Sequence, residues 1–259
     1  MVLLLILCAL IGLAVGSFLN VVIWRVPRGE SIVSPPSACP SCGHPIRNRD
    51  NVPVLGWLLL RRKCRDCQAA ISARYPAVEA ATGLLFAAMA WRFGFQLSLL
   101  GYLYLAAVGL ALALIDIDTK RLPDALTKPT WVVAAVTLTL AAAVGDRWDD
   151  LLRAAIGAAA LGAFYFLLWL VYPGGMGFGD VKLAPSLGAF LGWVSYGALA
   201  VGAFTGFLYG GVFGIGLILL KGGGRKSKVP FGPFMLLGAL TGIFAGPDLA
   251  QAYLNATIG

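Results

Sequence analysis

Most of this chain consists of apolar runs about as long as a membrane-spanning helix, separated by short polar segments. The sequence has 259 residues, of which 59% are hydrophobic and 12% are charged, whereas soluble domains carry about 25% charged residues. A helix needs about 20 apolar residues to cross the hydrocarbon core of a bilayer. The pattern excludes an ordinary soluble domain and predicts an all-α polytopic protein embedded in a lipid bilayer.

Eight transmembrane helices are predicted. Their expected ranges are 2–24, 77–93, 98–115, 130–145, 152–172, 183–200, 201–220 and 232–252. The boundary at residue 200 is weak, because residues 194–197 offer an alternative turn. Arg25 and Arg28 follow the first run, whereas a secretory signal carries its basic residues before the apolar stretch. A retained first helix is therefore favoured over a cleavable signal.

The basic residues divide unevenly between alternate connecting segments. If the N-terminus lies outside, the segments 25–76, 116–129, 173–182 and 221–231 face the cytoplasm and hold all but three of the 20 Lys and Arg. The exceptions are Arg92, Arg147 and Arg153. Cytoplasmic loops are enriched in basic residues, so the partition predicts this orientation in the inner membrane. The net positive charge of the chain is explained by these cytoplasmic segments, and nothing in the pattern of basic residues indicates binding to nucleic acid.

Two CxxC pairs lie in the one sizeable polar insert, 25–76, between the first two predicted helices. Cys39 and Cys42 are separated from Cys64 and Cys67 by 21 residues, close to the spacing of a zinc ribbon. Four thiolates complete a tetrahedral Zn²⁺ shell, and a metal can replace the core that so short an insert lacks. Disulfides or a redox pair are the rival interpretations, but a cytoplasmic location disfavours them.

Two aspartates stand where predicted spans meet polar segments. Asp116 closes one apolar run, and Asp180 lies in a GFGD sequence shortly before another. Ionisable residues at membrane depth indicate function, and two adjacent carboxyls can share one proton and activate water. Asp118 would face away from Asp116 on a helix, and Asp124 is typical of a helix N-cap. The predicted catalytic pair of an intramembrane aspartic protease is Asp116 and Asp180.

Other residues are candidates for a supporting role. Gly177 and Gly179 would let the backbone approach a substrate closely and adopt positive φ beside Asp180. Lys182 would interact with Asp180 or with an acidic group of the substrate. Glu79, at the entrance to the second predicted span, would either neutralise an arginine or assist catalysis. The alternative function is a proton-coupled transporter with a zinc docking module, but a proton path should carry acids at several depths.

The chain resembles the bacterial prepilin peptidases. The resemblance rests on both CxxC pairs, on Glu79, and on segments 16–27, 50–57, 74–76, 116–124, 177–182 and 230–233. It implies cleavage of the leader of type IV prepilins and pseudopilins, followed by N-methylation of the new terminus with S-adenosylmethionine. It places the catalytic aspartates at Asp116 and Asp180. No methyltransferase glycine motif is present, so no contact to the methyl donor is predicted.

The resemblance also implies a division of labour along the chain. Residues 1–24 would form the first transmembrane helix, and residues 25–76 the cytoplasmic zinc-binding insert linked to methylation. Residues 77–259 would form the membrane-embedded aspartic peptidase core. Both the active site and the insert are expected to face the cytoplasm.

Overall fold

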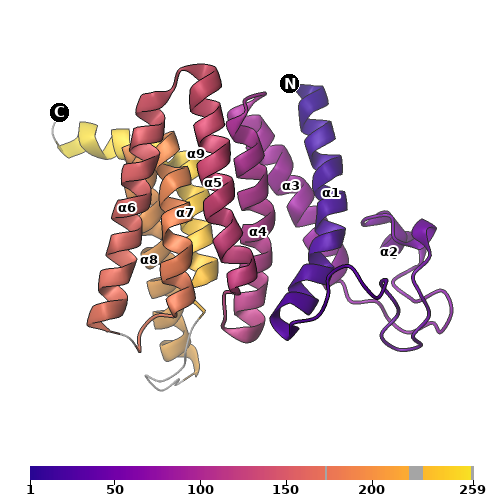
Figure 1. Cartoon of the computed structure of the whole chain (residues 1–259). Coiled ribbons are helices and arrows are strands. Elements are labelled where there is room, and N and C mark those ends of the chain that lie inside the picture. Colours follow the sequence, from indigo (N-terminus) through magenta and orange to yellow (C-terminus); the bar gives the residue numbers. More distant parts are fainter. Residues whose placement is uncertain (173, 222–229, 258–259) are drawn as a thin grey trace. The chain divides into compact units, whose positions relative to one another are not determined.

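The computed structural model describes residues 1–172, 174–221 and 230–257. Within these ranges the chain is helical, and its long helices confirm the predicted all-α architecture (Figure 1). They are α1 Val2–Arg25, α3 Arg74–Phe93, α4 Ser98–Thr119, α5 Asp124–Gly145, α6 Trp148–Val171, α7 Phe178–Val194, α8 Tyr196–Lys221 and α9 Gly232–Thr257. Short helices η1 Val26–Arg28, η2 Asn48–Asp50 and α2 Leu55–Leu59 lie between α1 and α3.

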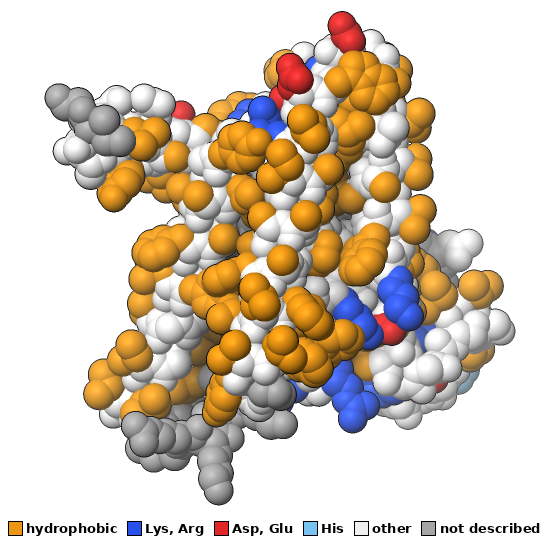
Figure 2. All heavy atoms as spheres, turned by 60° about the vertical axis from the view of Figure 1, so that its left-hand side comes forward, with side chains coloured by type: hydrophobic (Ala, Val, Ile, Leu, Met, Phe, Trp, Pro, Cys, Tyr) orange, Lys and Arg blue, Asp and Glu red, His pale blue; other side chains and the backbone are white. Residues whose placement is uncertain are grey.

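Six of the long helices have the length and apolar composition needed to cross a bilayer. Helices α3 and α7 are not among them: α3 begins with a polar turn, and α7 has only 17 residues. Large hydrophobic side chains cover much of the helical surface, whereas the charged side chains gather towards helix ends (Figure 2). This distribution fits helices whose apolar sides face lipid.

The weak boundary at residue 200 is wrong, and the alternative turn is correct. Helix α7 ends at Val194, and Ser195 adopts an extended conformation before α8 begins at Tyr196. The Ser195 hydroxyl accepts a hydrogen bond from the Ala198 N–H at 2.9 Å, so it caps the first turn of α8. The basic connector expected at 221–231 falls largely on residues 222–229, which lie outside the described part of the chain.

The chain divides into two compact units, Met1–Ala111 and Leu112–Gly259. In the first unit, α1 packs on α3. A Cβ added to Gly16 of α1 would lie 2.7 Å from the Cα of Glu79, and one added to Gly12 would lie 2.8 Å from the Cα of Gly83. Small residues let membrane helices approach each other closely, which gives van der Waals contact that lipid cannot replace.

In the second unit, α7 is the central helix and contacts α5, α6, α8 and α9. Most of its residues are buried. Its closest neighbour is α6, where Gly157 faces Gly188 so tightly that a Cβ on either residue would collide with the carbonyl oxygen of the other. At this crossing α6 and α7 are therefore in direct contact through their backbones.

We expect Gly188→Val to destabilise the protein by about 1–3 kcal/mol, because the added side chain must push α6 and α7 apart. Thermal unfolding of the purified protein in detergent measures the effect. Gly214→Val is the matched control, since an added Cβ there meets no atom within 4 Å. A Gly188→Val protein as stable as this control would contradict the packing described.

Candidate functional site

Asp116 lies near the C-terminal end of α4 and is almost completely buried, with 5% of its surface exposed. Its Oδ2 atom accepts a hydrogen bond of 3.0 Å from the backbone N–H of Gly232, the first residue of α9. A Cβ on Gly232 would lie 2.9 Å from the same oxygen. Glycine at this position therefore allows the backbone of α9 to hold the carboxyl directly.

Asp180 occupies the first turn of α7 and is also 5% exposed. Its Oδ2 atom accepts a hydrogen bond of 3.1 Å from the N–H of Gly177, which precedes the helix. A carboxylate at the third position of a helix satisfies a backbone donor and interacts favourably with the helix dipole. Asp180 thus belongs to a helix start, not to the loop expected from the sequence.

The fold brings Asp116 and Asp180 to one site within the second unit. Leu122 contacts both sides of it: a Cβ on Gly179, beside Asp180, would lie 2.8 Å from the Cβ of Leu122, and a Cβ on Gly232 would lie 3.2 Å from its Cδ2. The Asp116 carboxyl is also close enough to act electrostatically on Asp180. Two carboxyls buried in one site disfavour ionisation of both at once.

The glycines before Asp180 do not adopt the positive φ that the sequence suggested. Gly177 has φ −73°, and Gly179 lies inside the first turn of α7. Positive φ occurs among the described glycines at residues 29, 43 and 94. Gly179 is required because a side chain there would collide with Leu122, so the residue provides room for Leu122 and not a special backbone conformation.

The other polar residues beside the site have different surroundings. Asp118 is exposed near the end of α4. Asp124 makes no N-cap hydrogen bond; its carboxylate instead binds the ammonium groups of Lys182 at 2.6 Å and Lys128 at 3.0 Å. Lys182 therefore ties α7 to the start of α5. Its predicted role towards Asp180 or the substrate stays a prediction.

Four of the five cysteines of the first unit converge. The Sγ atoms of Cys39, Cys42, Cys64 and Cys67 all lie within 4.8 Å of one another, and all four thiols are free. The Sγ atoms of Cys39 and Cys67 are 3.8 Å apart. A tetrahedral ion with metal–sulfur bonds of about 2.3 Å sets its sulfur atoms roughly 3.8 Å apart. The cluster therefore has the donor set and spacing of a structural zinc site.

Each CxxC pair sits in a tight hairpin of the same design. The Cys39 N–H donates to the His44 carbonyl at 2.9 Å, and the Cys64 N–H donates to the Ala69 carbonyl at 2.8 Å. Backbone N–H groups of Cys42 and Ser41 bind the Cys39 sulfur and lower the pKa of that thiol to about 6. Such donors stabilise the thiolate that a metal requires.

Polar contacts join the rest of the insert. Arg65 forms a bidentate ion pair with Asp50, at 2.6 and 2.9 Å, which holds the pKa of Asp50 below its usual range. Arg47 pairs with Asp66 at 2.8 Å. Glu79 is buried on α3 and accepts the N–H of Val54 at 2.7 Å. Glu79 therefore anchors the insert to α3; its predicted catalytic role stays a prediction.

Two features of the structure have no clear sequence signal. The Gly232 N–H that holds Asp116 comes from a residue 116 positions away along the chain. A second feature is Arg153, which binds the C-terminal end of α7. In the sequence, Arg153 is one of three basic residues outside the predicted cytoplasmic segments. Its role becomes visible only from its hydrogen bonds to the carbonyls of α7.

The fold and site define a class: a multi-pass membrane protein with a buried aspartate pair and a separate four-cysteine centre. Residues 10–93 match the bacterial peptidase A24 N-terminal domain, and residues 103–219 match the type IV leader peptidase family. No solved structure matches the chain.

Relatives named prepilin leader peptidase/N-methyltransferase are similar over nearly the whole chain. The Aeromonas salmonicida protein is 35% identical over 290 residues, and the Neisseria gonorrhoeae protein is 39% identical over 278 residues; each alignment covers 96% of this chain and 93% of the relative. The Pseudomonas aeruginosa protein is 36% identical with the same coverage.

This chain belongs to the type IV leader peptidase family. It is therefore a peptidase of the inner membrane with several spans, as the resemblance predicted. The alternative of a proton-coupled transporter receives no support from these relatives.

We expect the protein purified under reducing conditions to contain about one zinc per chain, because the four thiolates form a complete tetrahedral shell. Elemental analysis measures it. Acidification or a strong chelator should release the metal, since protons compete for the thiolates. Protein with Cys8→Ser, which changes a buried cysteine outside the cluster, should keep its zinc. A zinc-free wild-type protein would contradict the assignment.

Proposed function

We propose that this chain removes the leader of type IV prepilins or pseudopilins with Asp116 and Asp180, and then N-methylates the exposed terminus. The observation that carries the proposal is the burial of these two carboxyls in one site. The names of the full-length relatives supply the substrate class. The leader is expected to be short and basic and to be cut after a glycine, before the hydrophobic stem.

The two aspartates have complementary tasks in cleavage. The ionised carboxylate takes a proton from water, while the protonated carboxyl polarises the scissile carbonyl and later protonates the leaving nitrogen. Gly232 and Gly177 each hold one Oδ2 atom through a backbone N–H. In the described part of the chain no hydrogen bond occupies the Oδ1 atoms, so these oxygens are available to water and to the shared proton.

We place the site and the insert at the cytoplasmic side of the membrane. The support is the distribution of the basic residues, because all but three of the 20 lie in the four segments assigned to that side. Asp116 and Asp180 both adjoin such segments. A prepilin whose stem lies in the bilayer would present its leader junction at this depth.

The methylation step is assigned to the chain's N-terminal part. Cys39, Cys42, Cys64 and Cys67 would hold a Zn²⁺ that keeps the insert folded, and S-adenosylmethionine would supply the methyl group. The chain must present an unprotonated terminal amine to that group in a fixed orientation. We assign residues 1–24 to the first span, 25–76 to the methylation-linked insert and 77–259 to the peptidase core.

Asp116→Asn and Asp180→Asn should each reduce cleavage on the order of 10³-fold or more, since a shared-proton pair fails when either carboxyl is lost. Asp118→Asn is the matched control and should retain substantial activity, because Asp118 is exposed near the end of α4. The assay is cleavage of a prepilin by the reconstituted protein. An inactive Asp118→Asn together with an active Asp116→Asn would show that the wrong aspartate has been assigned.

Serine at the four cluster cysteines should lower methylation more than cleavage, because the metal-bearing insert contains no buried carboxyl pair. Mass spectrometry of the pilin gives the ratio of methylated to cleaved product for wild type and variant. Some loss of cleavage is expected, since the insert also packs through Glu79 on α3. An unchanged ratio would contradict the division of labour, even if both rates fell.

A further inference from the structure

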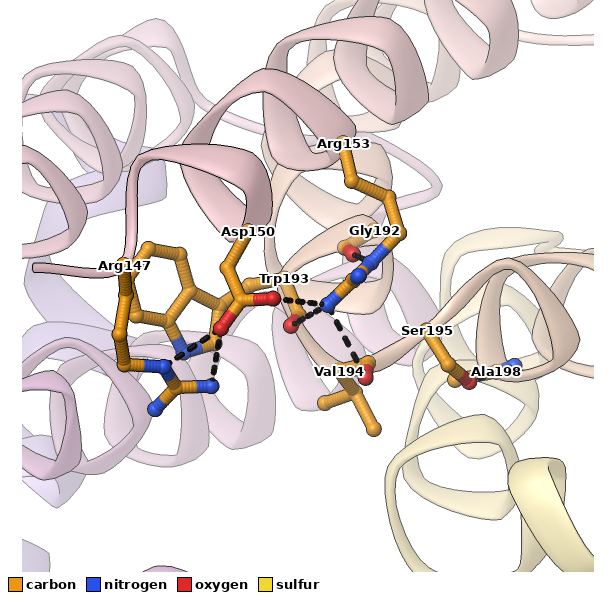
Figure 3. Close-up of polar contacts among 8 residues, drawn as sticks. All are labelled: Arg147, Asp150, Arg153, Gly192, Trp193, Val194, Ser195 and Ala198. Atoms are coloured by element: carbon orange, nitrogen blue, oxygen red, sulfur yellow. Dashed lines mark hydrogen bonds and ion pairs between the residues drawn. The ribbon is translucent and has the colours of Figure 1, made fainter. Parts of the chain in front are cut away.

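The C-terminal end of α7 is held by a charged side chain from α6. Arg153 donates from Nε to the Gly192 carbonyl at 2.6 Å and from Nη2 to the Trp193 carbonyl at 2.8 Å (Figure 3). The Val194 carbonyl lies 3.4 Å from the same nitrogen. The last four carbonyls of a helix lack partners within it. Ser195 N–H occupies the Leu191 carbonyl, so Arg153 serves the remaining three.

Arg153 is itself held in place by an acidic residue of its own helix. Asp150 accepts a hydrogen bond from Arg153 at 2.7 Å and also binds Arg147. The Arg147 guanidinium lies 4.7 Å from the ring centroid of Trp193, which is buried on α7. We call Arg147, Asp150 and Arg153 the α6–α7 clamp. The cation lies at the negative end of the α7 dipole and the carboxylate at the positive end of the α6 dipole, and both positions are favourable.

The clamp acts on the helix that carries Asp180. Asp180 lies in the first turn of α7, roughly 20 Å along the axis from the clamped carbonyls. Between the two ends, α6 and α7 meet through Gly157, Gly188 and Gly192. These glycines allow the two backbones to approach closely. The hydrogen bonds of Arg153 add directional contacts between α6 and the C-terminal end of α7.

We propose that Arg153, oriented by Asp150, is a positioning residue for peptide cleavage, which fixes α7 along its axis and so sets Asp180 against Asp116. The inference rests on the proposed function of the two aspartates. Asp116 is held separately by Gly232 of α9, so a shift of α7 changes the separation of the two carboxyls. A displacement near 1 Å at a reacting group can cost about 10²-fold in rate.

The test measures kcat and KM for prepilin cleavage with the purified full-length protein. Arg153→Gln and Asp150→Asn should lower kcat by about 10- to 100-fold and leave KM within about twofold, because the clamp lies at the end of α7 opposite to Asp180. Arg153→Lys should retain more activity than Arg153→Gln, since an ammonium group can still donate to the carbonyls. Asp149→Asn is the matched control, because Asp149 is exposed and outside the clamp, and it should match wild type.

Wild-type kcat in Arg153→Gln and Asp150→Asn would overturn the inference. So would a parallel loss of kcat in Asp149→Asn, which would show a general charge effect. If Arg153→Gln fails to fold, Asp150→Asn decides, because it keeps the shape of the side chain. A wild-type protein that does not cleave prepilin would refute the proposed function instead, so the two failures are distinguishable.

Discussion

The free-energy cost of placing charged groups beside hydrocarbon constrains where this protein can carry them. Among the described residues of the second unit, Asp116 binds the Gly232 N–H and Asp180 binds the Gly177 N–H. Arg153 binds the carbonyls of Gly192 and Trp193 as well as Asp150. Most of these partners are backbone groups at helix ends. Helix ends are where a membrane protein has unsatisfied donors and acceptors to offer. The aspartate site and the clamp are therefore both built at helix ends.

Helix α7 connects these two places. It is short and mostly buried, and it is in contact with four other helices. Its glycines allow close contact with α6 without side-chain packing. Polar contacts near both ends of the helix add directional interactions with neighbouring helices. Lys182 contributes near the Asp180 end through its ion pair with Asp124. A short helix fixed at both ends is a suitable support for one member of the proposed catalytic pair.

The insert of the first unit is stabilised in a different way. It has few buried side chains, and its hairpins, its ion pairs and the thiolate cluster define its shape. A bound metal would supply the stabilisation that a hydrophobic core supplies in a larger domain. Glu79 then joins the insert to α3 through the Val54 N–H.

The sequence by itself determined the helical class and the cysteine cluster and identified the two aspartates as candidates, because span length, CxxC spacing and charge at membrane depth are local signals. It placed the α7–α8 boundary at residue 200 and gave the correct turn at 194–197 only as the alternative. It also assigned positive φ to glycines that instead provide space. Only the tertiary structure decided that Gly232 holds Asp116 and that Arg153 caps α7. Those contacts join backbone groups to residues far away in the chain, and a backbone N–H or C=O carries no side-chain identity for a sequence to reveal.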